Sequence, residues 1–304
     1  MIADSLKEKN LLHIQDLYKV YGQNVILDNI DLSVSEGAFV TVVGPSGCGK
    51  STLLRLILGQ EQQTSGQLLL DQKPVGFTNV ERGIVYQKYS LFPNKTVLEN
   101  VLLGKKLGKN AKNWSKNKKE ETERAMHFLD SVKLAPHAKK YPHELSGGMQ
   151  QRVAVMQALI MNPRILMMDE PFGALDPGTR EDIQLFLLEQ WKTHNMTIFF
   201  VTHDLEEAVF LGTRLIVVSQ YYSDNRGFSP TDHRHGSKIV ADYNIQHNND
   251  DISGSVTEKM TAEFGGLIEE IRHEGFDPKN LQHVSTFNLK HTNSFQTLTT
   301  EEHN

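Results

Sequence analysis

A glycine-rich run at residues 44–52 has the composition of a loop that binds the phosphates of a nucleotide. Its members are Gly44, Pro45, Ser46, Gly47, Cys48, Gly49, Lys50, Ser51 and Thr52. A phosphate chain needs backbone N–H groups aimed at it, and glycines let the main chain turn tightly and come close. In such a loop the lysine reaches the β- and γ-phosphates and the serine hydroxyl ligates Mg²⁺. The run predicts a site for ATP, with a chance match in a glycine-containing turn as the alternative.

Two acids follow a second apolar run. Residues 165–168 are typical of a buried strand, and Asp169 and Glu170 come directly after it. Mg²⁺ prefers oxygen ligands, and a second carboxylate can polarise a water molecule for attack on the γ-phosphate. The pair fits a site that hydrolyses MgATP, although strands also end in acidic turns without such a role.

A second glycine pair, in Leu145-Ser146-Gly147-Gly148-Met149-Gln150, precedes a helical pattern. One interpretation is a glycine turn with a helix cap. The other is a second anion site, built from the Ser146 hydroxyl, the glycine N–H groups and the helix N-terminus. One chain has no evident use for two γ-phosphate sites around one nucleotide, whereas two chains that face each other do.

These segments need a scaffold of alternating strands and helices. Short apolar runs predict buried strands at residues 39–43, 165–168, 197–201 and 215–218. Helical patterns lie between them: the first stops at Gly59, the second follows the cap Asp176-Pro177 and the third follows the cap Asp204. This order predicts a mostly parallel α/β sheet.

Other parts of the chain have their own patterns. Residues 11–36 predict antiparallel strands with breaks at Tyr21-Gly22 and Asp28-Asn29, and residues 68–70 predict another short strand. Residues 88–142 are charged, rich in lysine and helical in pattern.

The strand and helix order ends after Tyr221. Residues 221–237 are polar and have the character of an insertion, and residues 238–245 could form one strand. One helical face is predicted to carry Met260, Phe264, Leu267, Ile268 and Ile271. Beyond Pro278 the sequence has no periodicity, and we expect a loose tail.

Over residues 11–220 the sequence resembles the nucleotide-binding subunits of ATP-binding cassette (ABC) transporters. The motifs that carry the resemblance are the glycine-rich loop, LSGGMQQR at 145–152, Met168-Asp169-Glu170-Pro171, Ala174-Leu175-Asp176 and Thr202-His203-Asp204. The resemblance implies a P-loop NTPase cassette over residues 1–220, in which a mostly parallel core sheet is joined by an antiparallel β subdomain. It also implies an inserted helical subdomain at about residues 88–160, with residues 221–304 as a C-terminal extension.

The resemblance implies catalytic roles for four residues. Lys50 would bind the phosphates and Glu170 would be the general base. His203 would contact the γ-phosphate, and Gln87 would sense Mg²⁺ and the attacking water beside the membrane-subunit contact. Taken alone, a histidine such as His203 is usually a capping or surface residue. The implied Mg²⁺ ligands are Ser51, Gln87 and Asp169.

The remaining implied roles concern contacts with the adenine ring and with the second protomer. Tyr21 would stack on adenine, although taken alone such a tyrosine is more often a packed strand aromatic. Asp176 would communicate across the dimer. Ser146, Gly147 and Gly148 would complete the nucleotide site of the other protomer.

Residues 92–101 and 141–145 resemble importer ATPases, nearest to those for nitrate, sulfonate and taurine. The implied cofactors are ATP and Mg²⁺. The implied partners are a second copy of the chain, integral membrane permease subunits and, indirectly, an extracytoplasmic solute-binding protein, with the chain peripheral on the cytoplasmic face of the inner membrane. The sequence departs from the pattern of these importers at Met156-Gln157-Ala158-Leu159 and in the insertion at 221–237. The identity of the transported solute therefore stays open.

Composition excludes several other classes of protein. The 304 residues are 38% hydrophobic and 23% charged, unlike a wholly disordered chain, and the net charge of -5 gives no case for nucleic acid as a partner. One cysteine allows no intramolecular disulfide and fits a reducing cytosol. The first eight residues do not have the pattern of a secretion signal, and every apolar run is too short to span a bilayer. A membrane role would therefore work through a partner or through surface attachment.

Three further features each have two explanations. The lysines between residues 105 and 119, with Trp114, could meet anionic lipid or form a solvated loop. His233 and His235 could ligate a metal or belong to a loose histidine-rich segment. Cys48 could be a redox switch or a small residue that the loop tolerates.

Two rival functions stay open. A soluble cassette that acts in translation or DNA repair would have no membrane partner. Such proteins usually carry two cassettes, a long coiled coil or a zinc insertion, and this sequence has none of these. A regulatory cassette would use residues 221–304 to sense a solute.

Overall fold

The computed structural model describes residues 10–88, 91–107, 114–245 and 262–303, which fold into two compact units. The first unit comprises residues 1–78 and 199–304, and the second comprises residues 79–198. This division differs from the predicted boundary at residue 220, because the C-terminal residues share the hydrophobic core of the first unit. Strand β8 (Thr197–Val201) contains the boundary between the units.

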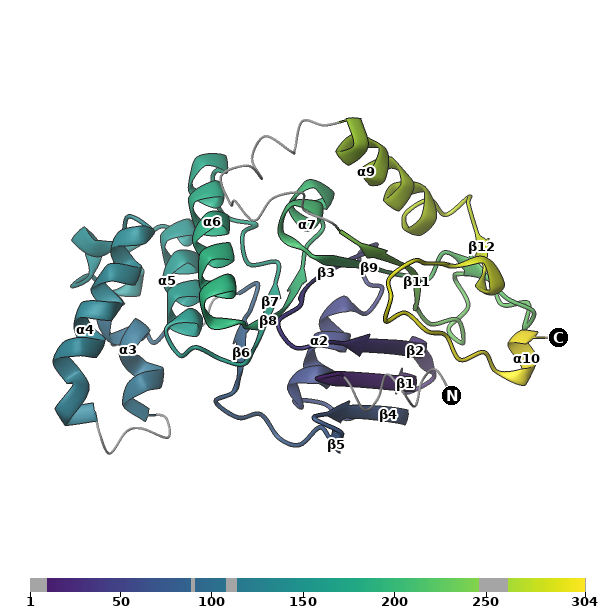
Figure 1. The fold of residues 1–304 in the computed structure, drawn as a ribbon, viewed down its shortest axis with the longest axis horizontal. Helices are drawn as coiled ribbons and strands as arrows, with labels where there is room; N and C mark the ends of the chain where they lie inside the picture. Colours follow the sequence, from purple (N-terminus) through teal and green to yellow (C-terminus); the bar gives the residue numbers. More distant parts are fainter. Residues whose placement is uncertain (1–9, 89–90, 108–113, 246–261, 304) are drawn as a thin grey trace. The chain divides into compact units, whose positions relative to one another are not determined.

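The first unit contains an antiparallel sheet with the order β2-β1-β4-β5 (Figure 1). Its strands are β1 (Leu12–Tyr21), β2 (Asn24–Val34), β4 (Ser65–Leu70) and β5 (Lys73–Pro74). The predicted turn at Tyr21-Gly22 is present, since Tyr21 pairs with Asn24. The predicted break at Asp28-Asn29 is wrong: β2 continues through an irregular register in which Asn29 has φ +51°. Partners from the C-terminal part of the chain bind both polar side chains there, so the strand does not need to end.

A second sheet of the first unit positions the phosphate loop. Strand β3 (Phe39–Val43) runs parallel to β9 (Arg214–Ser219), and β11 (Lys238–Asn244) pairs antiparallel with the other edge of β9. The rest of the unit consists of α2 (Lys50–Leu58), α7 (Leu205–Leu211), β10 (Tyr222–Ser223), α9 (Ala262–Gly275), β12 (Gln282–His283), η4 (Val284–Thr286), β13 (Asn288–Leu289) and α10 (Thr300–His303). The predicted parallel arrangement of β3 and β9 is therefore confirmed.

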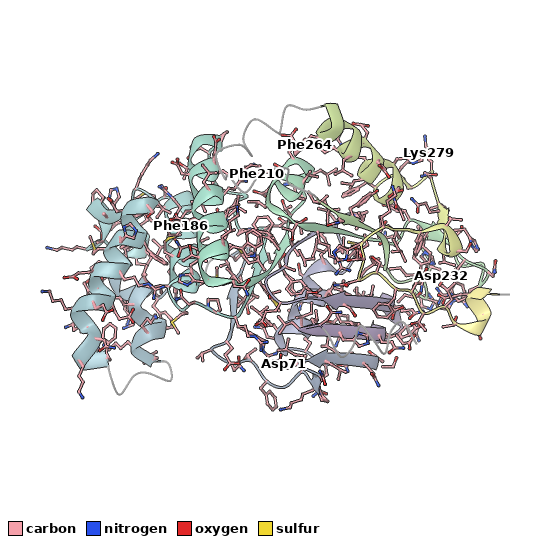
Figure 2. The ribbon with its side chains drawn as sticks, viewed as in Figure 1. Asp71, Phe186, Phe210, Asp232, Phe264 and Lys279 are labelled. Atoms are coloured by element: carbon pink, nitrogen blue, oxygen red, sulfur yellow. The ribbon has the colours of Figure 1, made fainter. Side chains whose placement is uncertain are left out.

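The expectation of a loose tail beyond Pro278 is wrong. The predicted strand and helix of this region are β11 and α9, although Met260 lies outside the described residues. Ile268 and Ile271 of α9 and Val284 of η4 join one buried cluster with residues of β3, β9 and α7. Figure 2 shows the side chains of this unit and labels Phe210 of α7 and Phe264 of α9. The residues beyond Pro278 form mainly extended segments, in which single side chains make the contacts with the rest of the unit. Such contacts leave no periodic pattern in the sequence.

The second unit pairs β6 (Arg82–Val85) in parallel with β7 (Ile165–Asp169). Its helices are α3 (Val97–Leu107), α4 (Trp114–Ser131), η2 (Ala135–His137), η3 (Pro142–Glu144), α5 (Gly147–Leu159) and α6 (Pro177–His194). Phe128 of α4 meets Phe186 of α6 edge to face, with ring centroids 5.2 Å apart. Across the part of the chain that the structure describes, we find no helix with the length and apolar character needed to cross a membrane.

Candidate nucleotide site

The phosphate loop connects β3 to α2 in the first unit. Gly44, Gly47 and Gly49 have φ values of +152°, +82° and +91°. Gly49 is the N-cap of α2 and provides no side-chain hydrogen bond to the helix start. The first N–H groups of a helix have no intrahelical acceptor, and the helix dipole is positive at this end. The loop and the helix start together have the features of an anion site.

Close packing explains why a glycine is needed at position 49. A Cβ there would lie 2.8 Å from Leu27 Cδ2 and 3.0 Å from Ile26 Cγ2. On the other side of the loop, a Cβ at Gly44 would lie 1.9 Å from the carbonyl oxygen of Val218. The loop therefore lies directly against β2 and β9.

The Lys50 ammonium is held inside the loop. Its Nζ donates to the carbonyl oxygens of Gly44 and Pro45, at 2.8 Å each, and the side chain is buried. Phosphate oxygens are stronger acceptors for an ammonium than neutral carbonyls are. The lysine is thus positioned to exchange these bonds for bonds to a nucleotide.

Cys48 is a residue of the loop itself and is 1% exposed. Burial raises the pKa of its thiol more than the nearby Lys50 ammonium lowers it. Because the thiolate is the reactive form, this environment disfavours oxidation. It supports the interpretation of Cys48 as a small residue that the loop tolerates.

Tyr21 is the last residue of β1 and is 41% exposed. The Lys19 Nζ lies 4.7 Å from the ring centroid, and the Tyr21 hydroxyl donates to Glu61. Glu61 also pairs with Lys19 and Arg55, at 3.2 and 2.7 Å. An exposed aromatic ring with a fixed hydroxyl is a suitable surface for stacking a base. The sequence did not identify Glu61, because it belongs to no recognisable motif.

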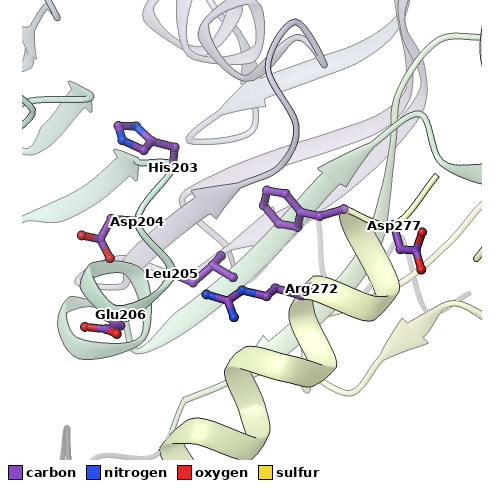
Figure 3. Close-up of a pocket in the computed structure, with 7 residues that line it drawn as sticks. His203, Asp204, Leu205, Glu206, Arg272 and Asp277 are labelled. Carbon is purple, nitrogen blue, oxygen red and sulfur yellow. The ribbon is translucent and has the colours of Figure 1, made fainter. Parts of the chain in front are cut away.

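His203 lies between β8 and α7, on a turn that buried hydrogen bonds fix. Thr202 Oγ1 donates to Glu207 at 2.6 Å, and Asp204 caps α7 by accepting from the Glu207 N–H at 3.1 Å. The histidine itself is exposed. It lines a pocket of about 600 Å³, of which Arg272 of α9 and Asp277 form part of the opposite wall (Figure 3). Helix α9 therefore borders the environment of His203.

The two predicted acids end β7 in the second unit. Glu170 adopts φ +47°, a left-handed conformation that is uncommon for a residue with a side chain. Gln87 Nε2 donates to Glu170 Oε2 at 2.8 Å. The structure thus places two of the four predicted catalytic residues in direct contact, and backbone strain of this kind often accompanies function.

Helix α5, which contains most of the LSGGMQQR motif, is also in the second unit. Ser146 is its N-cap, and the exposed hydroxyl accepts a hydrogen bond from the Met149 N–H at 3.3 Å. The Gln151 side chain accepts from the N–H of Ala174 at 3.2 Å, so this helix contacts the segment that leads to Asp176. The sequence did not identify Gln151 as a linking residue.

Asp176 caps α6, and its carboxylate accepts from the Thr179 N–H at 3.1 Å. That hydrogen bond holds the pKa of Asp176 below its usual range. The side chain is exposed and charged at neutral pH, as a residue that meets a second protomer would need to be.

The predicted Mg²⁺ ligands supply the right atoms. Ser51 has a hydroxyl, Asp169 a carboxylate and Gln87 an amide oxygen, and Mg²⁺ prefers such hard oxygen donors. Within the described ranges, no group of three or more His, Cys, Asp or Glu residues is arranged to hold a metal ion. His235 stacks on Tyr222, with ring centroids 4.1 Å apart, and is packed rather than loose.

The predicted lysine run is mixed with acids. Lys105 pairs with Glu121 at 3.5 Å and Lys119 with Glu123 at 4.0 Å, while Lys109 and Lys112 lie outside the described residues. This arrangement is typical of a solvated helix surface.

Known proteins match most of this chain. The family described as ABC transporter matches residues 27–173. The nitrate import ATP-binding protein NrtD of Synechocystis sp. is 45% identical over 212 residues, 68% of this chain and 77% of that protein. The taurine import ATP-binding protein TauB of Rhizobium johnstonii is 45% identical over 200 residues, 66% of this chain and 74% of that protein. The solved dimeric post-hydrolysis state of the ATP-binding cassette MJ0796, bound to ADP and Pi, is 30% identical with a TM-score of 0.62, over 78% of this chain and 99% of that chain.

Proposed function

Since this chain belongs to the ABC transporter family, we propose that it hydrolyses ATP to drive an importer, as a dimer that holds two nucleotides between its subunits. The presence of two different helix N-termini carries the proposal. One helix, α2, starts without a side-chain cap and with Lys50 beside it, and the other, α5, starts at an exposed Ser146. A nucleotide on α2 of one copy is completed by Ser146 and Gly148 of the second copy.

In the proposed reaction, Glu170 accepts a proton from the attacking water. A bond forms between the water oxygen and the γ-phosphorus, and the bond between that phosphorus and the oxygen of ADP breaks. Lys50, the N–H groups of the phosphate loop and His203 stabilise the charge on the γ-phosphoryl group. Ser51, Gln87 and Asp169 would hold Mg²⁺, which would supply Lewis-acid stabilisation of the phosphates. The Gln87 amide holds the Glu170 carboxylate in position.

The direct experiment replaces the base without changing its shape. Glu170→Gln keeps an oxygen that accepts from Gln87, so the local structure is preserved. The variant should bind ATP like the wild type, lose about 10²–10⁴-fold in turnover and accumulate a closed dimer. Turnover can be measured as phosphate release and dimer formation by light scattering. Wild-type turnover in this variant would refute the assignment of Glu170.

An apolar groove in the second unit supports the proposed membrane partner. It has a volume of about 320 Å³, and its walls include Val80, Tyr86 and Ala158. Tyr86 immediately precedes Gln87, so a helix of the permease seated here would sense the catalytic glutamine. Ala158→Glu should abolish copurification with the permease and leave ATP binding intact, whereas His127→Glu on the exposed face of α4 should change neither. Retained copurification in Ala158→Glu would exclude this groove as the docking site.

We propose that the solute is a small anion or zwitterion of the nitrate, sulfonate or taurine kind. The similarity to NrtD and TauB supports this. In this proposal the dimer lies on the cytoplasmic face of the membrane, and an extracytoplasmic binding protein delivers the solute. Uptake of each of the three solutes by vesicles that contain the chain and its permease is the test. ATP-dependent export would reverse the proposed direction.

A further inference from the structure

Strand β2 packs directly against the phosphate loop. Ile26 and Leu27 are the residues that a Cβ at Gly49 would meet, at 3.0 and 2.8 Å. The loop and the strand are therefore in van der Waals contact at the N-cap of α2. A displacement of β2 by a few tenths of an ångström changes the position of the N–H groups that face a phosphate.

The polar insertion forms hydrogen bonds to this part of β2. The Val25 N–H donates to His233 O at 2.8 Å, the Ser237 N–H to Ile26 O at 3.0 Å and the Asp28 N–H to Ser237 O at 2.9 Å. Between these bonds lies Gly236, where a Cβ would be 2.7 Å from Val25 Cγ1 and 2.9 Å from Asp28 Cβ. The insertion thus contacts β2 through a glycine that admits no side chain.

Buried ion pairs link β2 to the C-terminal part of the chain. Asp28 is fully buried, and Arg226 Nη2 donates to its Oδ2 at 2.7 Å. The same guanidinium bonds Asp224 at 2.6 Å. Lys238 pairs with Glu302 at 2.7 Å inside the same cluster. A buried carboxylate is stable only with such partners, so the position of β2 depends on them.

The opposite side of the loop also meets this segment. Val43, the last residue of β3, belongs to the cluster that contains Ile268 and Ile271 of α9 and Leu205 of α7. Residues 222–245 and 262–303, which we term the C-terminal segment, therefore pack against the strands on both sides of the phosphate loop and against the helix that follows His203.

We infer that the C-terminal segment sets the affinity of the phosphate loop for nucleotide, with Asp28, Arg226 and Gly236 as positioning residues. The inference rests on the proposed function only in that the loop must bind ATP. Because linkage is reciprocal, nucleotide on the loop must in turn tighten the segment. The segment acts through β2 and touches no substrate.

The first test compares matched pairs of variants. Gly236→Ala inserts a methyl group between the insertion and β2, and Gly265→Ala adds one on α9 where nothing lies within 4 Å. Arg226→Met removes the buried partner of Asp28, and Lys290→Met removes an exposed partner of Glu270. We expect Gly236→Ala and Arg226→Met to weaken the binding of a fluorescent ATP analogue about tenfold, and the two controls to stay within twofold.

A merely structural role gives a different result. In that case the thermal midpoint falls in Gly236→Ala and Arg226→Met, but the Kd of the folded fraction for the analogue is unchanged, and the inference is wrong. Failure of the wild type to bind the analogue would refute the proposed function instead, so the two failures are distinguishable.

The second test uses the wild-type chain and does not depend on the folding of a variant. Saturating MgATP should slow hydrogen exchange at the β2 amides of residues 25–28 and at the insertion amide of Ser237. It should also slow exchange at Thr297, whose N–H donates to Asp31 of β2. Slower exchange in the phosphate loop alone, with no change in β2 and the C-terminal segment, would overturn the inference.

Discussion

The helices α2 and α5 both start in glycine-rich sequence, but their N-termini are built in opposite ways. Helix α2 starts at Gly49 in a left-handed conformation and has no side-chain cap. Helix α5 starts at Ser146 in an extended conformation, and the serine hydroxyl accepts from the Met149 N–H. The first helix start is therefore open to an anion, while the second is already partly satisfied by its own side chain.

The charges beside the two helices differ in the same sense. Lys50 places an ammonium within the phosphate loop. The nearest arginine of α5, Arg152, turns away and donates to the carbonyl oxygen of Val132 at 2.7 Å. We therefore expect α2 to provide most of the affinity for nucleotide. In the proposed dimer, α5 would instead donate the Ser146 hydroxyl hydrogen to a phosphate that the phosphate loop of the other copy already holds.

The largest effect should come from a methyl group at the open helix start. Gly49→Ala combines a left-handed φ with contact at 2.8 Å to Leu27, so we expect ATP binding to weaken at least ~100-fold. Gly47→Ala is the matched control, because its φ is +82° but nothing lies within 4 Å. Equal losses in a binding titration of both variants would show that the contact with β2 does not matter.

Removal of Mg²⁺ should separate binding from turnover. With a chelator present, we expect hydrolysis to fall at least ~100-fold, because the phosphates lose Lewis-acid stabilisation. ATP binding should fall less than about tenfold, since the N–H groups of the loop and Lys50 still hold the phosphates. A calorimetric titration with and without the metal measures ATP binding, and phosphate release under the same two conditions measures turnover. Equal loss of binding and turnover would contradict the view that α2 provides most of the affinity.

Ser146→Ala tests the partly satisfied helix start. We expect about a tenfold loss of hydrolysis with ATP affinity within twofold, because the phosphate loop stays intact. The lost cap should also cost about 1 kcal/mol of stability. Thr96→Ala is the control, since Thr96 Oγ1 accepts from the Glu99 N–H at 3.3 Å in the same unit. Loss of hydrolysis in Thr96→Ala of similar size would mean that stability alone explains the effect.

Cys48 should give the smallest effect. Cys48→Ala should change ATP affinity by less than about threefold, because the side chain is small and buried. Burial raises its pKa, so little thiolate forms even at pH 8, and alkylation of the native protein should be slow. Fast labelling that tracks inactivation would instead support a redox role.

Most residues of the candidate site could be predicted from local sequence. The long-range contacts that hold the strands around the site could not. The phosphate loop, the acids after β7 and the cap Ser146 follow from residue types within a few positions of one another. The partners of β2 do not: Arg226 lies 198 residues beyond Asp28, and Glu302 lies 273 residues beyond Asn29. The ring of Phe295 likewise stacks on His13, with centroids 5.3 Å apart, in a stretch without periodicity. Periodicity reports local structure, and single long-range contacts leave no such signal.

The buried Asp28 has a consequence for biosynthesis. Translation produces β2 long before Arg226, its partner 198 residues later, so the nascent β2 strand holds a carboxylate that cannot yet be buried at low cost. Contacts of such long sequence separation also form slowly in refolding. The phosphate loop should therefore become competent late, after the insertion has been made, and a ribosome-bound chain that ends before residue 222 should need a chaperone rather than a nucleotide to protect it.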